Sequence, residues 1–362
     1  MRTILSKMKK KPTRRALARR HEALLACRSL DDLARLLGIA AERLMALATN
    51  PQYREFTVPK KDGSLRYIED PIPPLKRTLD YLGDFLQATY YAHRTPVAYG
   101  FVVRPLDDPE PRHVLSNAQA HLGQDWLLNV DLEDFFHFIP TERVREVFAA
   151  PLFGFPDEVC ELLANLCTHK GRLPMGAPTS PVLSNLASIP LDEDLMALAK
   201  QEHWTYTRYA DDMSFSSRAP IDAQDLARIE AIAQQWGHEL NPLKTRLYGP
   251  GDNKKEVTGL LVGGEAVSLP EDYLPTLEAA IDHLAKVVSA QQQVQSGRAQ
   301  SSPWVDDLRM GVHGKLEFAR HILGENHHWV SRLTGTYHDA IRPPESYGAL
   351  SWLEFGYDWD FR

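Results

Sequence analysis

Three aspartates stand where strands of this sequence are expected to end, and they are the residues best suited to do chemistry. Asp211 and Asp212 lie side by side between two strand-like runs, and Asp131 closes the apolar run 127–130. Paired acids are also common in solvated turns. Carboxylates at the ends of neighbouring strands, however, repel one another unless cations neutralise them, and their hard oxygens suit Mg²⁺. Two such ions, roughly 3.5–4 Å apart, would clamp the attacking and leaving oxygens of a phosphoryl displacement. The pattern therefore points to nucleotidyl transfer.

The elements that must position these carboxylates are short strands in the middle of the chain, with helices on either side. Alternating apolar residues predict two strands around a tight turn over 204–217, a strand over 127–131 and a β-hairpin over 53–71. Helices are expected over parts of 14–48 (one of them capped by Ser29 and running to about Leu37), 74–91, 141–150, 180–200, 221–237 and most of the chain after Pro270, outside a polar loop at 291–303. Further strands are expected over 257–267. The fold class is therefore α+β.

Composition is that of a globular protein of two or three domains, with 362 residues, 43% of them hydrophobic and 25% charged. The net charge of −7 is unevenly distributed, because residues 1–77 contain 18 Lys and Arg against 8 Asp and Glu. A polyanion would be attracted to this basic segment, although a solvated helix face explains the same charges. We find no secretory signal and no apolar run of the ~20 residues that span a membrane. Cys27, Cys160 and Cys167 lack the number and spacing of a disulfide or zinc framework. These features predict a reduced, cytoplasmic, soluble protein.

Five motifs, in order along the chain, resemble those of reverse transcriptases. They are Phe56–Arg66 (FTVPKKDGSLR), Asp131–Ile139 (DLEDFFHFI), Leu173–Pro181 (LPMGAPTSP), Tyr209–Asp212 (YADD) and Asn241–Thr245 (NPLKT). Two further strings, Asn117–His121 (NAQAH) and Val257–Gly259 (VTG), resemble elements of the retron type within that family. The resemblance covers residues 53–265 and implies a right-hand polymerase fold with fingers, palm and thumb.

The resemblance implies that the three aspartates are catalytic metal ligands. Asp131 and Asp211 are expected to bind two Mg²⁺ ions directly, with Asp212 nearer the primer end. Lys244, in the fifth motif, is expected near this centre, where it would stabilise or protonate the leaving pyrophosphate. The alternative for Lys244 is a solvated side chain at a helix end.

The resemblance also implies residues that would bind the incoming dNTP. Lys60 and Arg66 would reach the triphosphate, one as a point charge and the other as a planar fork. Phe136 stands where the family places a bulky side chain under the sugar, and it would exclude a 2′-OH unless it is a core aromatic. Gly176 would let the backbone approach the nucleotide. Met175 replaces the family's usual glutamine and removes a polar contact there.

A third group of residues consists of candidates for RNA binding. Asn117 and His121 would share one face of a helix, while a basic helix over 309–320 would follow an RNA–DNA duplex as part of a thumb. The full set is Asn117, His121, Val257, Thr258, Gly259, Arg309 and Lys315. Packing within the protein explains the first pair equally well, and a solvated helix explains the basic residues.

The resemblance finally implies an organisation and a role. A basic helical extension (1–50) would precede interleaved fingers and palm (51–268) and a helical thumb (269–362). The activity would be RNA-directed DNA synthesis in a retron, with a structured noncoding RNA as template and primer. Synthesis would start at a guanosine 2′-OH and give branched msDNA, in anti-phage defence with an effector or toxin protein. The alternatives are a group II intron-like or other bacterial reverse transcriptase, and an RNA- and DNA-binding scaffold that restrains a toxin. No membrane partner is expected, and self-association stays open.

Overall fold

The computed structural model describes residues 11–60, 63–294 and 302–342, and contacts divide the chain into two compact units, Met1–Asp252 and Asn253–Arg362. The elements of the first unit are α1 Arg14–Leu25, α2 Leu30–Leu37, α3 Ala41–Thr49, β1 Tyr53–Pro59, β2 Leu65–Pro71, α4 Pro73–His93, α5 Val114–Gln119, β3 Trp126–Asp131, α6 Thr141–Ala149, α7 Asp157–Cys167, α8 Ser180–Ala187, α9 Ile189–Gln201, β4 Thr205–Tyr209, β5 Asp212–Ser217, α10 Ala223–Gln235 and β6 Arg246–Tyr248. Those of the second are β7 Glu256–Val257, β8 Leu260–Leu261, α11 Tyr273–Val294, α12 Pro303–Leu323 and α13 His328–Ile341. Within these described ranges, no helix combines the length and the apolar character that crossing a bilayer demands.

The N-terminal helices are part of the first unit's core. The hydroxyl of Ser29 accepts a hydrogen bond from the Asp32 amide at the start of α2, and Gly38 ends that helix in the left-handed conformation. Helix α1 packs along α4, and α3 packs against α7. The side chains of Leu24 and Leu33 are fully buried there. The boundary between the two compact units therefore lies between residues 252 and 253 of the chain, whereas the sequence suggested boundaries at 50/51 and 268/269. The assignment of fingers, palm and thumb stays a prediction.

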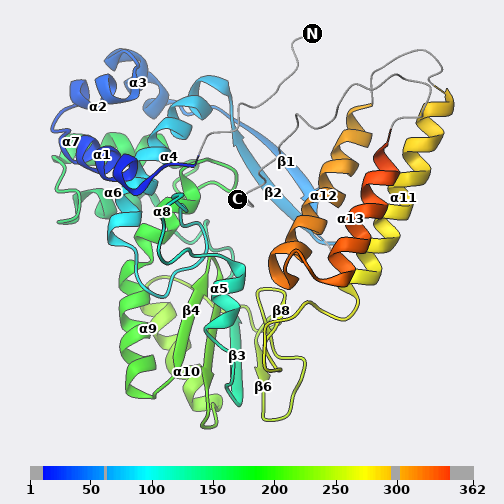
Figure 1. Ribbon diagram of the computed structural model, residues 1–362. Helices are drawn as coiled ribbons and strands as arrows, with labels where there is room; N and C mark the ends of the chain where they lie inside the picture. The colour runs from blue at the N-terminus through cyan, green and yellow to red at the C-terminus, as the bar shows by residue number, and fades with distance from the viewer. Residues whose placement is uncertain (1–10, 61–62, 295–301, 343–362) are drawn as a thin grey trace. The chain divides into compact units, whose positions relative to one another are not determined.

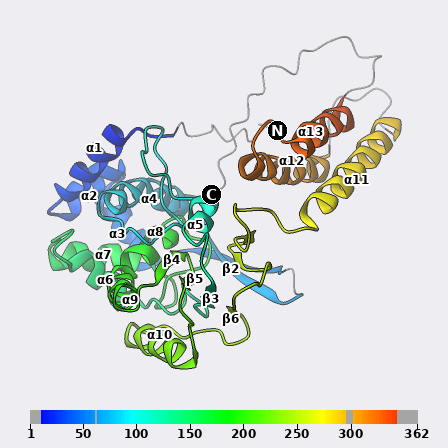
Figure 2. The same cartoon turned by 60° about the horizontal axis from the view of Figure 1, so that its bottom comes forward.

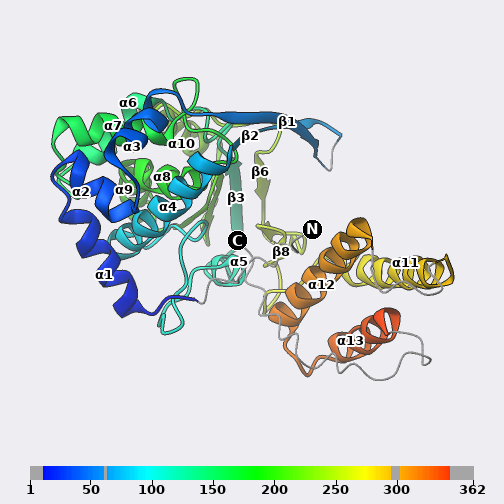
Figure 3. The ribbon, with the colours of Figure 1, turned by 90° about the horizontal axis from the view of Figure 1, so that it is seen from above.

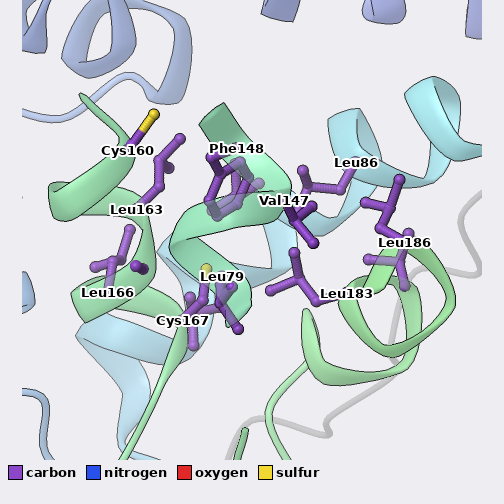
Figure 4. Close-up of a cluster of buried hydrophobic side chains, with 14 of the residues drawn as sticks. Leu79, Leu86, Val147, Phe148, Cys160, Leu163, Leu166, Cys167, Leu183 and Leu186 are labelled. Carbon is purple, nitrogen blue, oxygen red and sulfur yellow. The ribbon is translucent and has the colours of Figure 1, made fainter. Parts of the chain in front are cut away.

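The larger hydrophobic core lies among helices α4, α6, α7 and α8 (Figure 4). On α4, Leu79 and Leu86 lie on one side because they are separated by about two helical turns. They meet Phe148 of α6, Leu163 of α7 and Leu183 of α8, and all five side chains are completely buried. Burial of each such side chain contributes about 1.5–3 kcal/mol to folding, so this core fixes the frame that carries the site.

Strands β1 and β2 form the expected hairpin, which projects from the rest of the first unit (Figure 3). Their antiparallel register runs from Tyr53 opposite Pro71 to Pro59 opposite Leu65. The expected turn includes residues 61–62, which lie outside the described residues. At the base of the hairpin, the Glu69 amide donates a hydrogen bond of 2.8 Å to the carbonyl oxygen of Met175. The hairpin is thereby joined to the segment that precedes α8.

The central sheet has the strand order β4-β5-β3-β6, with antiparallel neighbours. Side chains alternate between its faces. Helices α9 and α10 lie beside the sheet (Figures 1 and 2), and Tyr206, Met213 and Phe215 belong to the hydrophobic cluster that includes residues of both helices. Polar side chains such as Thr207 and Ser216 point to the other face, where α5 contacts β4. The strands expected over 127–131 and 204–217 are confirmed.

The helix expected over 180–200 is wrong in one respect, because the chain forms two helices, α8 and α9, that meet at Ser188. Pro190, in the first turn of α9, has no amide hydrogen to donate to the preceding turn. Helices α5 and α7 and strand β6 were not predicted. Helix α5 has six residues and β6 has three, too few to show a period. Helix α7 has 11 residues and its buried side chains do follow a helical period, so this helix could have been predicted.

The described residues of the second unit form three helices and a small hairpin. Helix α11 packs against α12 and α13. The strands expected over 257–267 are present only as the two-residue pair β7 and β8 and a bridge between Leu261 and Ser268. Thr258 and Gly259 form the two-residue connection, both with positive φ, as tight hairpin turns require.

Candidate active site

The sheet brings the three aspartates together, although Asp131 is far from the other two in sequence. Asp131 is the last residue of β3 and stands directly opposite Asp212, the first residue of β5. Asp211 lies in the turn between β4 and β5, where its carbonyl oxygen accepts a hydrogen bond of 3.0 Å from the Leu132 amide. Ala210 allows this turn by adopting a left-handed conformation with a φ of 59°. The expected juxtaposition is therefore present, while the role of the carboxylates in metal binding stays a prediction.

The pKa values of Asp211 and Asp212 are raised in this cluster. Asp131 is 5% exposed. Desolvation and the charge of Asp131 raise the pKa of Asp211 above its ordinary value. Although Asp212 reaches the surface, desolvation and the charges of Asp211 and Asp131 raise its pKa to about 7. Such shifts mean that the ionised cluster is electrostatically unfavourable, and added positive charge relieves it.

Lys244 supplies positive charge at this cluster. Its Nζ donates hydrogen bonds of 2.8 Å to both carboxylate oxygens of Asp131. Desolvation acts to lower the pKa of Lys244, but the bond to Asp131 and the charges of all three aspartates raise it overall. The sequence placed Lys244 beside the leaving pyrophosphate, whereas the structure places its ammonium group on a carboxylate.

The donor set fits hard divalent cations. Carboxylate oxygens are the ligands that Mg²⁺ prefers, and the ammonium group of Lys244 shows that a cation is held on Asp131. The three aspartates do not present one oxygen each within 4.8 Å of the others, so binding one ion with all three requires side-chain adjustment. Among the described residues, Glu55, Glu69 and His169 do meet that distance. Their carboxylates, however, already bind cationic side chains, as in the pairs Lys170–Glu55 and Arg172–Glu69.

The two expected triphosphate contacts lie on the hairpin. Arg66 of β2 stands opposite Val58 of β1 and is exposed. Its charge acts to lower the pKa of Asp211, which places the guanidinium group within electrostatic reach of the carboxylates. Lys60 is exposed beyond the end of β1, where its carbonyl oxygen accepts from the Gly63 amide. Both side chains are open to an anionic ligand.

Phe136 follows β3 in a tight turn that includes Asp134, with a φ of 40°. Its half-buried ring lies 5.6 Å from the ring of Phe135 and 5.9 Å from that of Phe101, measured between centroids. Phe135 is buried in the core. The Phe136 ring is half-buried and packs against the core, so its role under the sugar stays a prediction.

Gly176 has a structural reason to be glycine. Its φ is 136°, and a Cβ atom there would lie 2.7 Å from the carbonyl oxygen of Glu69. The side chain of Met175 is half-buried, and its backbone binds the same residue of β2. The sequence explained Gly176 by close approach to a nucleotide, but the close approach in the structure is to β2.

The RNA-binding prediction is wrong in the structure for the side chains of Asn117 and His121. Each is only 1% exposed. The His121 ring lies between two hydroxyl groups, with Nδ1 2.7 Å from Ser216 Oγ and Nε2 2.7 Å from Thr207 Oγ1. Burial lowers the pKa of His121 to about 3, so the ring is neutral. His121 lies in the turn that follows α5 rather than on the helix, and its ring is directed at the sheet.

The remaining RNA-binding candidates lie in the second unit. Val257 is fully buried, which removes its side chain from contact with RNA. Thr258 and Gly259 form the hairpin turn. Arg309 pairs with Asp306 at 3.8 Å, and Lys315 is exposed. The RNA-binding role of Thr258, Gly259, Arg309 and Lys315 stays a prediction.

Sequence reasoning missed the charged residues that are buried beside the site. Arg208 of β4 and Asp192 of α9 are both 0% exposed and pair with each other. One signal was present: Arg208 occupies the face of β4 that Tyr206 also occupies, and that face is otherwise apolar.

Comparisons with known proteins agree with the motifs. The family model of reverse transcriptase (RNA-dependent DNA polymerase) matches residues 58–263. The chain is 33% identical to the retron Mx162 reverse transcriptase of Myxococcus xanthus, over 71% of this chain and 59% of that protein. It is 31% identical to the retron Ec86 reverse transcriptase of Escherichia coli, over 73% of this chain and 81% of that protein. Among solved structures it is similar to telomerase from Candida albicans in complex with a fragment of telomeric RNA, with a TM-score of 0.44 and 8% identity, over 82% of this chain and 64% of that chain.

Proposed function

The chain belongs to the reverse transcriptase family as a retron-type member with a right-hand polymerase fold, and from this premise we propose that it is the RNA-directed DNA polymerase of a retron. The observation that carries the proposal is the convergence of Asp131, Asp211 and Asp212 at one end of the sheet. Placing these carboxylates together is costly, as the raised pKa values of Asp211 and Asp212 indicate, and the binding of divalent cations would offset that cost.

The reaction would be attack of a primer hydroxyl on the α-phosphate of a dNTP, with release of pyrophosphate. Asp131 and Asp211 would hold two Mg²⁺ ions, with Asp212 toward the primer. When bound, the ions would activate the hydroxyl and stabilise the charge on the phosphate. Lys244 would release Asp131 and move its charge toward the pyrophosphate.

Residues of the hairpin and the turn after β3 would select the nucleotide. Arg66, with its charge near Asp211, would bind phosphate oxygens, and Lys60 would do so from the hairpin tip. The ring of Phe136, held against Phe101 and Phe135, would lie under the sugar. Because two neighbouring rings restrain it, it would leave no space for a 2′-OH.

The retron type of the relatives supports a proposal for the partners. We propose a structured noncoding RNA as template and primer, initiation at a guanosine 2′-OH, and branched msDNA as the product. An effector or toxin protein would act with this complex in anti-phage defence. Thr258, Gly259, Arg309 and Lys315, of which Gly259 and Lys315 are exposed, remain the proposed RNA contacts of the second unit.

Purification of the protein from cells, followed by analysis of the nucleic acid bound to it, tests the function. We expect RNase-resistant DNA of one discrete size joined to RNA. Asp211→Asn should reduce this DNA at least about 100-fold, because it removes a charge from the reacting centre. The matched control is Asp80→Asn, at an exposed position of α4. Branched DNA at the normal level from Asp211→Asn would refute the catalytic assignment. If the unaltered protein carried bound RNA but no DNA, the alternative of an RNA- and DNA-binding scaffold that restrains a toxin would be favoured.

A further inference from the structure

A buried charged residue contacts the turn that carries Asp211 and Asp212. Arg208, on β4, is 0% exposed. Its Nε and Nη2 donate hydrogen bonds of 2.7 Å to the two carboxylate oxygens of Asp192 on α9. Its Nη1 donates to the carbonyl oxygen of Ala210 at 3.1 Å. One guanidinium group therefore joins a helix to the backbone of the turn.

The helix side of this contact is held rigidly. Asp192 also accepts hydrogen bonds from the hydroxyl of Tyr206 at 3.0 Å and from that of Thr95 at 2.9 Å. Its carboxylate is fully buried. A buried carboxylate with four hydrogen-bond donors has a fixed orientation, and it fixes the plane of the guanidinium group in turn.

The segment that follows Thr95 supports the turn from a second direction. The Arg208 amide donates to the carbonyl oxygen of Val97, and the Tyr99 amide donates to that of Arg208, each at 2.8 Å. Gly100 packs directly on the turn, since a Cβ atom at this position would lie 2.5 Å from the Ala210 nitrogen. Only a glycine permits this approach.

Asn185, on α8, links the two supports. Its Oδ1 accepts a hydrogen bond of 3.1 Å from Arg208 Nη1, and its Nδ2 donates one of 2.9 Å to the carbonyl oxygen of Gly100. The guanidinium group, the turn and the supporting segment therefore belong to one buried polar network. Ala210 needs such support because its left-handed conformation is unfavourable for a residue with a Cβ atom.

We propose that Arg208, oriented by Asp192, is a positioning residue that holds the Ala210 turn so that Asp211 and Asp212 face Asp131. This inference deepens the proposed function and rests on it for the use of the carboxylates. Stability alone accounts poorly for the pair, because a buried salt bridge is often no more stabilising than apolar residues of similar volume. What apolar residues cannot supply is the bond to the carbonyl oxygen of Ala210.

The test measures the binding of Mn²⁺ to the full-length protein by electron paramagnetic resonance, together with dNTP incorporation. Arg208→Lys keeps the charge but lacks the fork that reaches Asp192 and Ala210 together. It should weaken Mn²⁺ binding about tenfold, the effect of one hydrogen bond from a charged group. Thr95→Val is the matched control, because it removes a buried bond to Asp192 and leaves the bond to Ala210. It should lower the melting temperature and change Mn²⁺ affinity less than twofold.

A second variant covers the case in which Arg208→Lys does not fold. The double change Arg208→Met with Asp192→Leu removes both charges together and leaves neither unpaired. It should fold and show the same weakening of Mn²⁺ binding. Mn²⁺ affinity equal to that of the unaltered protein in either Arg208 variant would overturn the proposal, as would an equal loss in Thr95→Val. If the unaltered protein bound Mn²⁺ but incorporated no dNTP, the proposed function would fail while the positioning role could still hold.

Discussion

Replacing His121 by glutamine should remove a pH dependence from the stability of the first unit. The ring is buried between Thr207 and Ser216, and its pKa is lowered from 6.5 to about 3. Between these two values the unfolded chain binds a proton that the folded chain does not bind. The free energy of unfolding therefore falls as the pH falls through this window, by about 1.4 kcal/mol for each pH unit.

The size of the effect follows from the pH range that is used. From pH 7.5 to pH 4.5 only the interval below 6.5 counts, so the His121 contribution should fall by about 2.7 kcal/mol. Urea denaturation at both pH values, followed by tryptophan fluorescence, gives the stability of the unaltered protein and of His121→Gln. The variant should be less stable at pH 7.5, because two buried hydroxyl groups lose their partner, and the difference should shrink by that amount at pH 4.5.

Comparing the unaltered protein with His121→Gln removes the contributions that other titrating groups make to the pH dependence of stability. His238, for example, also has a pKa lowered to about 4 by burial, and it is present in both. The same replacement at His283, which is exposed, supplies the baseline. A stability difference that stays constant between the two pH values would refute the reasoning, because it would mean that His121 is protonated in the folded state.

Two further predictions concern the nucleotide site. Phe136→Ala should lower the preference for dNTP over rNTP, measured as the ratio of kcat/KM values, about tenfold or more, because it opens space beside the sugar. Phe138→Ala is the control. An unchanged sugar preference in Phe136→Ala would contradict the proposed exclusion of the 2′-OH by this ring. Gly176→Ala should lower the free energy of unfolding by about 2 kcal/mol or more, because its Cβ would lie 2.7 Å from the Glu69 oxygen. Gly171→Ala is the control, because Gly171 also has a positive φ but a Cβ atom there would meet open space. If thermal unfolding showed equal losses of stability in the two glycine variants, the contact with the Glu69 oxygen would be unimportant.

The strands could be predicted because their signals are local. Alternation sets which residues of 204–217 face the core, and a two-residue tip leaves only one way to pair the strands. Asp131 is distant from this hairpin in sequence, and its grouping with Asp211 and Asp212 was predicted from the resemblance to reverse transcriptases. The break at Ser188 could also have been found, since Pro190 cannot continue a helix.

The direction in which polar residues face could not be predicted. The spacing of Asn117 and His121 predicts one shared helix face, but α5 ends at Gln119, and the direction of the His121 ring depends on Thr207 and Ser216, which are distant in sequence. Gly176 is similar, because the oxygen that it avoids belongs to Glu69. Partners of this kind are set by tertiary packing, which one sequence does not contain.

His121 and Arg208 support the same hairpin from opposite faces of the sheet, and their chemistry separates what each contributes. His121 is neutral and binds side chains within β4 and β5, so its loss should weaken the sheet without redirecting the turn. Arg208 binds the carbonyl oxygen of Ala210 itself, so its loss should change where Asp211 and Asp212 point. His121→Gln should therefore lower the stability of the protein more than its Mn²⁺ affinity. Compared with His121→Gln, Arg208→Lys should lower Mn²⁺ affinity more and stability less. If both variants lowered the two quantities in the same proportion, the hairpin would respond as one body, and no separate positioning role would be needed.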